Sequence, residues 1–339
     1  MLYSAAGGEW LPWAKAHAIR FAVGCTAMFV IAALPLNFWF RSAYWWYGAG
    51  VLLLTIVELM GVMGMGAQRW INVGGMTIQP SEFMKIAIVL ALARFFHTLH
   101  PMDRARLLWM LPPAIIIALP AVLILKQPNL GTATILVGLS IAIWFAGGLM
   151  WRYVIAGVLA IAAIIPLAWN FYLYDYQKQR VMTFLDPESD PLGAGYNIIQ
   201  SMIAIGSGGL EGKGFIKGSQ GQLDFLPEKH TDFIFTMLAE EFGFMGCAVV
   251  LMFFTFMLGY GVAIAIRARH RFGSLICIGI VAMLWLHVMI NVAMVMGLIP
   301  VVGVPLPFLS YGGTMLLTSC MAVGLVQNIY INRDAVLPR

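Results

Sequence analysis

The segment FGFMGCAVVLMFFTFMLGYGVAIA at residues 242–265 contains no charged residue and is long enough to cross a lipid bilayer as a helix. Lipid offers the backbone no hydrogen-bond partner, so a spanning segment must satisfy its own amide and carbonyl groups. An outer-membrane barrel would show stretches of alternating polarity, and this sequence lacks them. The segment therefore predicts a membrane-spanning helix.

Eight other apolar stretches of similar length occur along the chain. Of its 339 residues, 61% are hydrophobic and 10% are charged, whereas soluble domains have about 25% charged residues. This composition disfavours a soluble fold, which needs a charged surface to stay dispersed. We predict an all-α, polytopic membrane helix bundle that forms a single domain over residues 1–339. Its nine spans are expected near residues 19–40, 44–64, 82–99, 107–126, 130–150, 153–173, 242–265, 273–297 and 312–332.

Charge and cysteine content narrow the function further. The net charge is +5, and the basic residues form no stripe with interleaved aromatic residues, so nucleic acid is not expected as a partner. The cysteines lie apart in apolar segments without CxxC spacing, which predicts neither metal ligands nor disulfides. They are Cys25, Cys247, Cys277 and Cys320.

Loop charges indicate the orientation of the spans, because Lys and Arg accumulate in short cytoplasmic loops. One set of alternate loops is rich in Arg and is assigned to the cytoplasm. The opposite set contains a long polar stretch from about residue 175 to 241, predicted to be one large extracytoplasmic loop. Nine spans then place the N-terminus outside, a position that Lys15 and Arg20 fit poorly.

Ionisable residues within apolar spans are costly and are functional candidates. Glu82 and Lys85 are three residues apart, so on one helix they share a face and can form an ion pair. The stretch Gln79-Pro80-Ser81-Glu82 has the proline and the acid of a helix start. The pair is either purely structural or part of a site.

Other polar residues of the spans allow two interpretations. Lys126, followed by Gln127, stands at the outer end of its span, where it either extends to the membrane surface or faces an anionic group. Glu58 and His287 are single polar residues in apolar runs, for which hydrogen-bonded core positions are favoured.

The glycine-rich stretch GSGGLEGKG at 206–214 superficially resembles a phosphate-binding loop. Ser207 stands where the first glycine of that motif belongs, and Gly214 stands where its magnesium-binding hydroxyl belongs. We therefore expect these glycines to permit tight turns or a close approach of the backbone to a partner.

The long loop ends in FLPEKHTDFIF at 225–235, which places Asp232 at the edge of an apolar segment. One role for Asp232 is the N-cap of the following helix. The other is a general base, because a carboxylate at the rim of an apolar site is poised to take a proton from a hydroxyl group. Glu228, one helical turn earlier, is the substitute base.

Four segments carry a resemblance to a known family. QPSEFMK at 79–85, FLPEKHTDFIF at 225–235, PLPFLSYGG at 305–313 and the loop sequence at 184–209 resemble motifs of the SEDS (shape, elongation, division and sporulation) family. They occur in the family's order and cover most of the chain. Lys126-Gln127-Pro128, with Phe83-Met84, favours the elongation branch over the division branch.

The resemblance implies a multi-pass enzyme of the bacterial cytoplasmic membrane. Members polymerise lipid II into peptidoglycan at its outer face during cell elongation and rod-shape maintenance. A class B penicillin-binding protein serves as the transpeptidase partner, alongside other membrane proteins of the elongation complex. Asp232 matches the family's catalytic aspartate, and Glu82 and Lys85 match a buried polar pair in its central cavity.

Further residues near these motifs are expected to bind substrate. Cations that would neutralise a departing diphosphate are Lys85, Lys126, Arg180 and Lys229, or a divalent ion such as Mg²⁺ or Mn²⁺. The remaining candidates are Gln127, Glu228, His230 and Thr231. No residue is assigned as a metal ligand.

The sequence departs from the family pattern at Asn129 and Met202, neither of which is the expected base. Family members have ten spans, and residues 1–8 resemble the outer end of the first, so one span is expected to be missing here. Restoring it would place both ends in the cytoplasm.

Two other functions remain open. A flippase for a lipid-linked sugar would use intramembrane charges along its path, although it needs polar residues through the full depth of the membrane. A non-catalytic scaffold for cell-wall enzymes would tolerate loss of Asp232.

Overall fold

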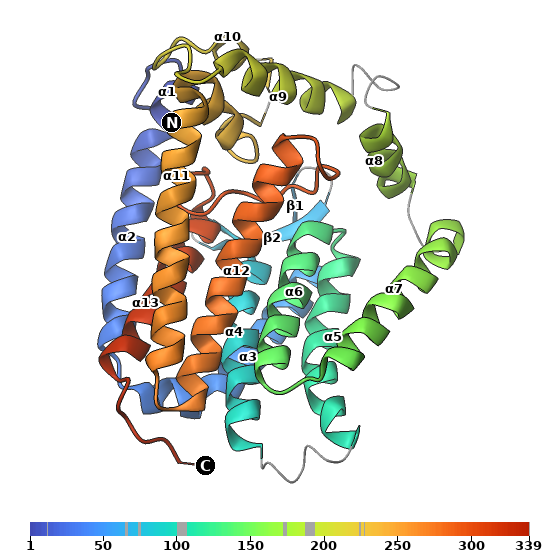
Figure 1. Ribbon diagram of the computed structural model, residues 1–339, viewed down its shortest axis with the longest axis vertical. Coiled ribbons are helices and arrows are strands. Elements are labelled where there is room, and N and C mark those ends of the chain that lie inside the picture. The colour runs from blue at the N-terminus through green and yellow to red at the C-terminus, as the bar shows by residue number, and fades with distance from the viewer. Residues whose placement is uncertain are drawn as a thin grey trace. The chain divides into compact units, whose positions relative to one another are not determined.

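The computed structural model of the chain describes residues 1–11, 13–64, 67–73, 76–99, 107–171, 175–186, 194–223, 225–226 and 228–338. The described residues are mainly helical (Figure 1). The helices are α1 (Leu2–Ala5), α2 (Ala14–Ala33), α3 (Leu36–Met60), α4 (Pro80–Thr98), α5 (Leu111–Lys126), α6 (Leu130–Ala146), α7 (Trp151–Phe171), α8 (Asp175–Leu185), α9 (Ala194–Gly208), α10 (Ser219–Gln222), α11 (Ile234–Arg267), α12 (Arg271–Val295) and α13 (Gly313–Ile331).

Six helices of the described chain are long and apolar enough to cross a membrane, which confirms a multi-pass membrane protein. They are α2, α3, α5 with the preceding turn, α11, α12 and α13. The three other predicted spans correspond to α4, α6 and α7. The prediction of membrane helices is therefore confirmed, while the number nine stays a prediction.

Helix α4 differs from the six because it carries Glu82, Lys85 and Arg94. It packs against α3, α5, α6 and α13, and most of its side chains are buried. A helix that faces other helices on most sides can hold polar groups that lipid would not accept. Its lower hydropathy thus follows from its central position.

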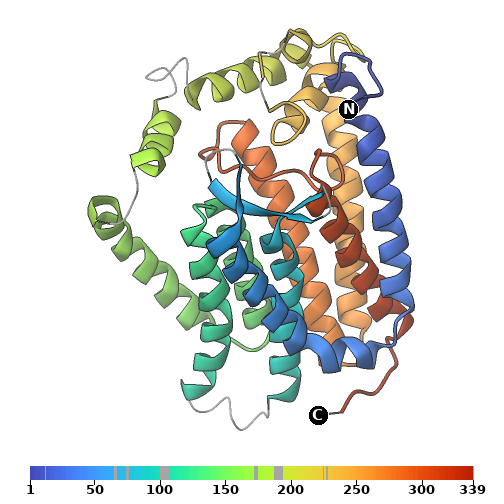
Figure 2. The same cartoon turned by 180° about the vertical axis from the view of Figure 1, so that it is seen from behind.

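A small antiparallel sheet was missed by the all-α prediction. Strands β1 (Val62–Gly64), β2 (Ala67–Val73) and β3 (Met76–Ile78) pair in the order β1-β2-β3 between α3 and α4 (Figure 2). In β2, Trp70 pairs with Val62 and Ile71 pairs with Ile78. β1 falls at the end of the span predicted at 44–64, whereas β2 and β3 fall in the short stretch between that span and the next, which was expected to be a loop.

The predicted loop at about 175–241 is helical in much of its described part, which includes α8, α9 and α10. Its last residues belong to α11, which begins at Ile234. Gly243 interrupts α11 with a left-handed backbone (φ 63°, ψ −163°), which produces a kink. The extracytoplasmic location of this region stays a prediction.

The chain forms two compact units. The first comprises Met1–Ala14, Gly148–Phe253 and Val288–Ser310, and the second comprises Lys15–Gly147, Phe254–His287 and Tyr311–Arg339. Asp232 belongs to the first unit, and the Glu82–Lys85 pair belongs to the second.

Candidate active site

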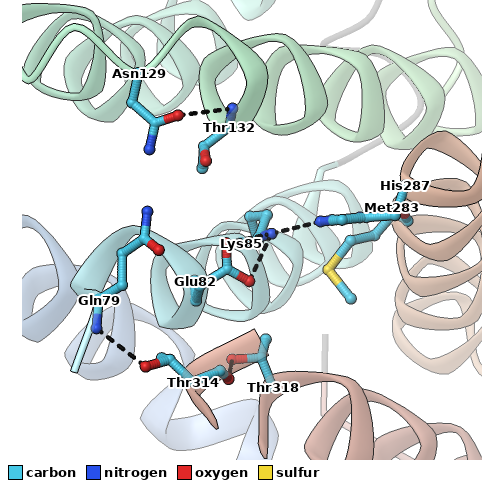
Figure 3. Close-up of polar contacts among 9 residues, drawn as sticks. All are labelled: Gln79, Glu82, Lys85, Asn129, Thr132, Met283, His287, Thr314 and Thr318. Carbon is cyan, nitrogen blue, oxygen red and sulfur yellow. Dashed lines mark hydrogen bonds and ion pairs between the residues drawn. The ribbon is translucent and has the colours of Figure 1, made fainter. Parts of the chain in front are cut away.

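Lys85 lies at the centre of a buried polar cluster in the second unit. Its Nζ is 2.8 Å from Oε2 of Glu82 and 2.9 Å from Oε1, and it lies 2.8 Å from Nε2 of His287 (Figure 3). All three residues are buried: Glu82 is 4% exposed, Lys85 0% and His287 1%. The predicted ion pair is therefore present and has a third member from α12.

The hydrogen bonds define the tautomer of His287. Its Nδ1 is 2.8 Å from the carbonyl oxygen of Met283, which can only accept, so Nδ1 carries the proton. The lone pair of Nε2 then accepts a hydrogen bond from Lys85. His287 is thus a hydrogen-bonded core residue, as expected, but its partner is a candidate site residue.

Glu82 of this cluster belongs to the start of α4. The helix begins at Pro80 with Gln79 as its capping residue, which confirms the predicted helix start. The amide of Gln79 donates to Oγ1 of Thr314 in α13 at 3.2 Å (Figure 3). Glu82 lies in the first turn, where the helix dipole favours a negative charge.

Lys126 and Gln127 have different environments. Lys126 is exposed at the end of α5, whereas Gln127 is buried and donates from Nε2 to the carbonyl of Leu54 at 3.1 Å. Arg69, which was not among the residues expected from the sequence, also lies here. Its guanidinium donates to the carbonyl of Gln127 at 2.9 Å and to that of Pro128.

Asp232 lies in a turn immediately before α11 in the first unit, and it is half-buried. The amides of Thr231 and Phe233 both donate to the carbonyl of Glu228, at 3.1 and 3.2 Å. The carbonyl of Phe233 accepts the first helical hydrogen bonds, so Phe233 occupies the capping position. Asp232 therefore lies one residue before the observed N-cap position, which differs from the N-cap role considered for it.

Four neighbours of Asp232 make contacts within the protein. Oε2 of Glu228 accepts a hydrogen bond from Oγ1 of Thr231 at 2.8 Å. Lys229 is buried and donates from Nζ to the carbonyl of Gly221 at 2.6 Å. His230 stacks on Trp13 with ring centroids 4.3 Å apart. Substrate binding by these residues stays a prediction.

The protonation of His230 follows from its environment. Burial lowers the pKa of His230 below its usual value, Glu228 opposes this effect, and Lys229 adds to it. The imidazole is therefore neutral near pH 7. A cationic role for His230 at that pH is disfavoured.

Two residues that sequence reasoning missed support the turn. Nδ2 of Asn291 donates to the carbonyl of Asp232 at 2.9 Å, and Oγ of Ser310 donates to the carbonyl of Thr231 at 2.6 Å. Asn291 lies in an apolar run, and Ser310 lies in the PLPFLSYGG motif. Only the folded chain brings them next to Asp232.

Arg180 belongs to α8, but its side chain lies outside the described residues, as do residues 187–193 of the matching loop motif. Among the residues that the structure does describe, no group of three or more His, Cys, Asp or Glu side chains could hold a metal ion.

The glycine-rich stretch packs against the kink of α11. Glu240 is buried and its carboxylate accepts hydrogen bonds from Nζ of Lys213 at 2.8 Å and from the amides of Gln220 and Gly221. The amide of Gly214 donates to the carbonyl of Glu241 at 3.0 Å. The expected close approach of backbone is confirmed, and the partner is this chain's own helix.

Replacing Gly212 with Ala should separate this loop from α11. Gly212 has φ +81°, and a β-carbon there would lie 2.6 Å from the amide nitrogen of Gly243. Backbone strain and overpacking should together destabilise the loop by about 1–3 kcal/mol. Limited proteolysis should then cut the loop faster than in the unchanged protein.

Gly206→Ala is the matched control, because a β-carbon at Gly206 in α9 meets no atom within 4 Å. Alanine should stabilise that helix slightly. Equal proteolysis of both variants would contradict the docking of the loop.

An apolar pocket of about 330 Å³ opens in the second unit beside α3 and α4. Its lining includes Trp39, Trp46, Gly50, Phe83, Ala87 and Met321. A pocket with almost no polar surface suits a hydrocarbon chain and not a sugar or a diphosphate.

Known proteins resemble this chain over nearly its whole length. The FtsW/RodA/SpoVE family model, described as "Cell cycle protein", matches residues 5–335. "Peptidoglycan glycosyltransferase MrdB" of Escherichia coli (strain K12) is 44% identical over 323 residues, which cover 93% of this chain and 84% of that protein.

Solved structures show the same relationship. One described as "Structural coordination of polymerization and crosslinking by a peptidoglycan synthase complex" matches with a TM-score of 0.82 and 33% identity, over 94% of this chain and 90% of the other. The rod shape determining protein RodA of Thermus thermophilus matches with a TM-score of 0.72 and 27% identity, over 99% and 92%. The chain therefore belongs to the FtsW/RodA/SpoVE family, which is the SEDS family that its motifs resemble.

Proposed function

We propose that this chain is a peptidoglycan glycosyltransferase that polymerises lipid II at the outer face of the bacterial cytoplasmic membrane during cell elongation. The observation that carries this proposal is the 44% identity to a peptidoglycan glycosyltransferase across 93% of the chain. A match over 93% of the chain includes most residues of both units.

Asp232 is the proposed general base. Its carboxylate takes the proton from the acceptor sugar hydroxyl, whose oxygen then forms a bond to the anomeric carbon of the donor sugar. The bond from that carbon to the diphosphate oxygen breaks, and the diphosphate leaves with the electron pair. Diphosphate is a weak base, so the reaction does not need the acid that glycosidases supply to a sugar leaving group.

The departing diphosphate requires positive charge. Among the proposed cations, Lys85 and Lys229 already donate to groups of the protein, whereas Lys126 is exposed. Lys126 is therefore the most accessible of these three for an anion. A Mg²⁺ or Mn²⁺ ion would supply similar charge, since such ions bind through one or two carboxylates and the substrate's phosphates.

The apolar pocket of the second unit, beside α3 and α4, has the kind of surface that a hydrocarbon chain needs. A lipid-linked sugar carries a long hydrocarbon chain, and this pocket offers it an apolar surface. A class B penicillin-binding protein is the proposed transpeptidase partner. This assignment is supported by the similarity to a chain of a peptidoglycan synthase complex.

The decisive experiment is polymerisation of purified lipid II by the isolated protein, with and without a transpeptidase-inactive partner. We expect glycan polymer in both cases, because the proposed base belongs to this chain. Movement of lipid II across vesicles without polymer would indicate a flippase. If polymer never forms although the partner binds, the chain is a scaffold.

A further inference from the structure

We infer, on the basis of the proposed function, that Asn291 and Ser310 are positioning residues that fix the orientation of the Asp232 carboxylate. Both are buried, at 0% and 3% exposure, and both lie in the same unit as Asp232. Neither needs to touch the substrate to act in this way.

The two peptide groups that flank the α-carbon of Asp232 are each held by one of these side chains. Ser310 donates to the carbonyl of Thr231, which belongs to the preceding peptide group. Asn291 donates to the carbonyl of Asp232 itself, which belongs to the following one. Fixing both peptide planes fixes φ and ψ of Asp232, and therefore the direction of its Cα–Cβ bond.

The two side chains are themselves held in single orientations. Oγ of Ser310 accepts the amide hydrogen of Leu306 at 2.8 Å, so its own hydrogen is directed to Thr231. Nδ2 of Asn291 donates its second hydrogen to the carbonyl of Val304 at 2.7 Å. Both partners are carbonyl oxygens, which only accept hydrogen bonds. The side-chain atom of Asn291 that faces them must therefore be the nitrogen.

Stability alone does not account for Asn291. Its Oδ1 is buried and has no hydrogen-bond partner among the described residues. A buried acceptor without a donor is unfavourable. The unpaired Oδ1 therefore offsets part of the stability that the two hydrogen bonds of Nδ2 contribute. Retaining asparagine here is consistent with a role in placing the turn.

The segment at 303–310, which contains Ser310 and is bonded to Asn291, also borders the carboxylate of Asp232. Gly303 has a left-handed backbone (φ +68°), and a β-carbon there would lie 3.4 Å from Oδ2 of Asp232. Phe308, in the same segment, has φ 63°, which is strained for a residue with a side chain. Strained backbone persists only where surrounding contacts impose it, and Ser310 supplies such contacts two residues later.

Positioning matters because a general base must lie within about 2.6–3.2 Å of the group that carries the proton. A misplacement of about 1 Å can lower the rate about 100-fold. Releasing one peptide plane beside Asp232 should therefore slow catalysis without weakening substrate binding.

The test compares Ser310→Ala and Asn291→Ala with Ser310→Thr, which keeps the hydroxyl group. For each variant, kcat and KM for lipid II polymerisation, the folded fraction and the thermal midpoint in detergent are measured. We expect Ser310→Ala and Asn291→Ala to lower kcat about 10- to 100-fold with KM within about twofold. Ser310→Thr should recover most of the kcat lost in Ser310→Ala.

Three results would overturn the positioning role: unchanged kcat in both alanine variants, a loss of kcat that only follows the folded fraction, or a raised KM at constant kcat. Asp232→Asn is measured beside them. If Asp232→Asn is inactive and the alanine variants are fully active, the positioning role is wrong and the proposed function stands. If Asp232→Asn is fully active, Asp232 is not the base and the positioning role is wrong, while polymerisation of lipid II by this chain stands. If the unchanged protein forms no polymer, the proposed function itself is wrong.

Discussion

Replacing Asp232 with Asn should lower the rate of glycan polymerisation by about 10²- to 10⁴-fold, the usual contribution of a general base. The amide has nearly the same shape as the carboxylate but does not accept a proton at neutral pH. The contacts of the Asp232 backbone with Asn291 do not involve the side chain. Because the replacement keeps the shape of the side chain, the variant should fold normally while its polymerisation rate falls.

Glu228→Gln is the matched control for this prediction. Glu228 lies in the same turn, and its carboxylate accepts a hydrogen bond from Thr231, which a glutamine oxygen can also accept. We expect this variant to lose far less activity than Asp232→Asn, because a glutamine keeps hydrogen-bonding groups at this position. The reverse result, an active Asp232→Asn and an inactive Glu228→Gln, would assign the base to Glu228.

Sequence reasoning predicted the features that depend on local pattern. The membrane helices follow from apolar length, and the Glu82–Lys85 pair follows from a spacing of three on one helix. The start of α4 at Pro80 follows from its proline and acid. In each case the residues that form the sequence pattern are also the residues that form the feature, or lie within a few positions of it.

Features that depend on distant parts of the chain could not be predicted in this way. His287 is 202 residues from Lys85, and Asn291 is 59 residues from Asp232. Each is a single polar residue in an apolar run, and a run of that kind does not reveal which helix it faces. For the same reason, the sequence did not reveal which segment the glycine-rich stretch packs against. Its glycines indicated only that the backbone approaches some partner closely.

Replacing Lys85 with Met should destabilise the protein by about 3–5 kcal/mol, the usual result of removing one partner from a buried ion pair. Lys85 is fully buried, and its loss leaves the Glu82 carboxylate and Nε2 of His287 without this donor. Thermal unfolding in detergent should show a clearly lower midpoint.

The double variant Glu82→Gln/Lys85→Met separates the two roles that the sequence left open for this pair. Removing both charges should restore most of the stability, because neutral side chains of similar volume often replace a buried ion pair at little cost. Recovery should be incomplete, since Nε2 of His287 still lacks its donor.

If the pair is only structural, the restored protein will polymerise lipid II at nearly the normal rate. If Lys85 takes part in binding or catalysis, the double variant will be stable and inactive. A single Lys85→Met variant with an unchanged midpoint would contradict the buried ion pair itself.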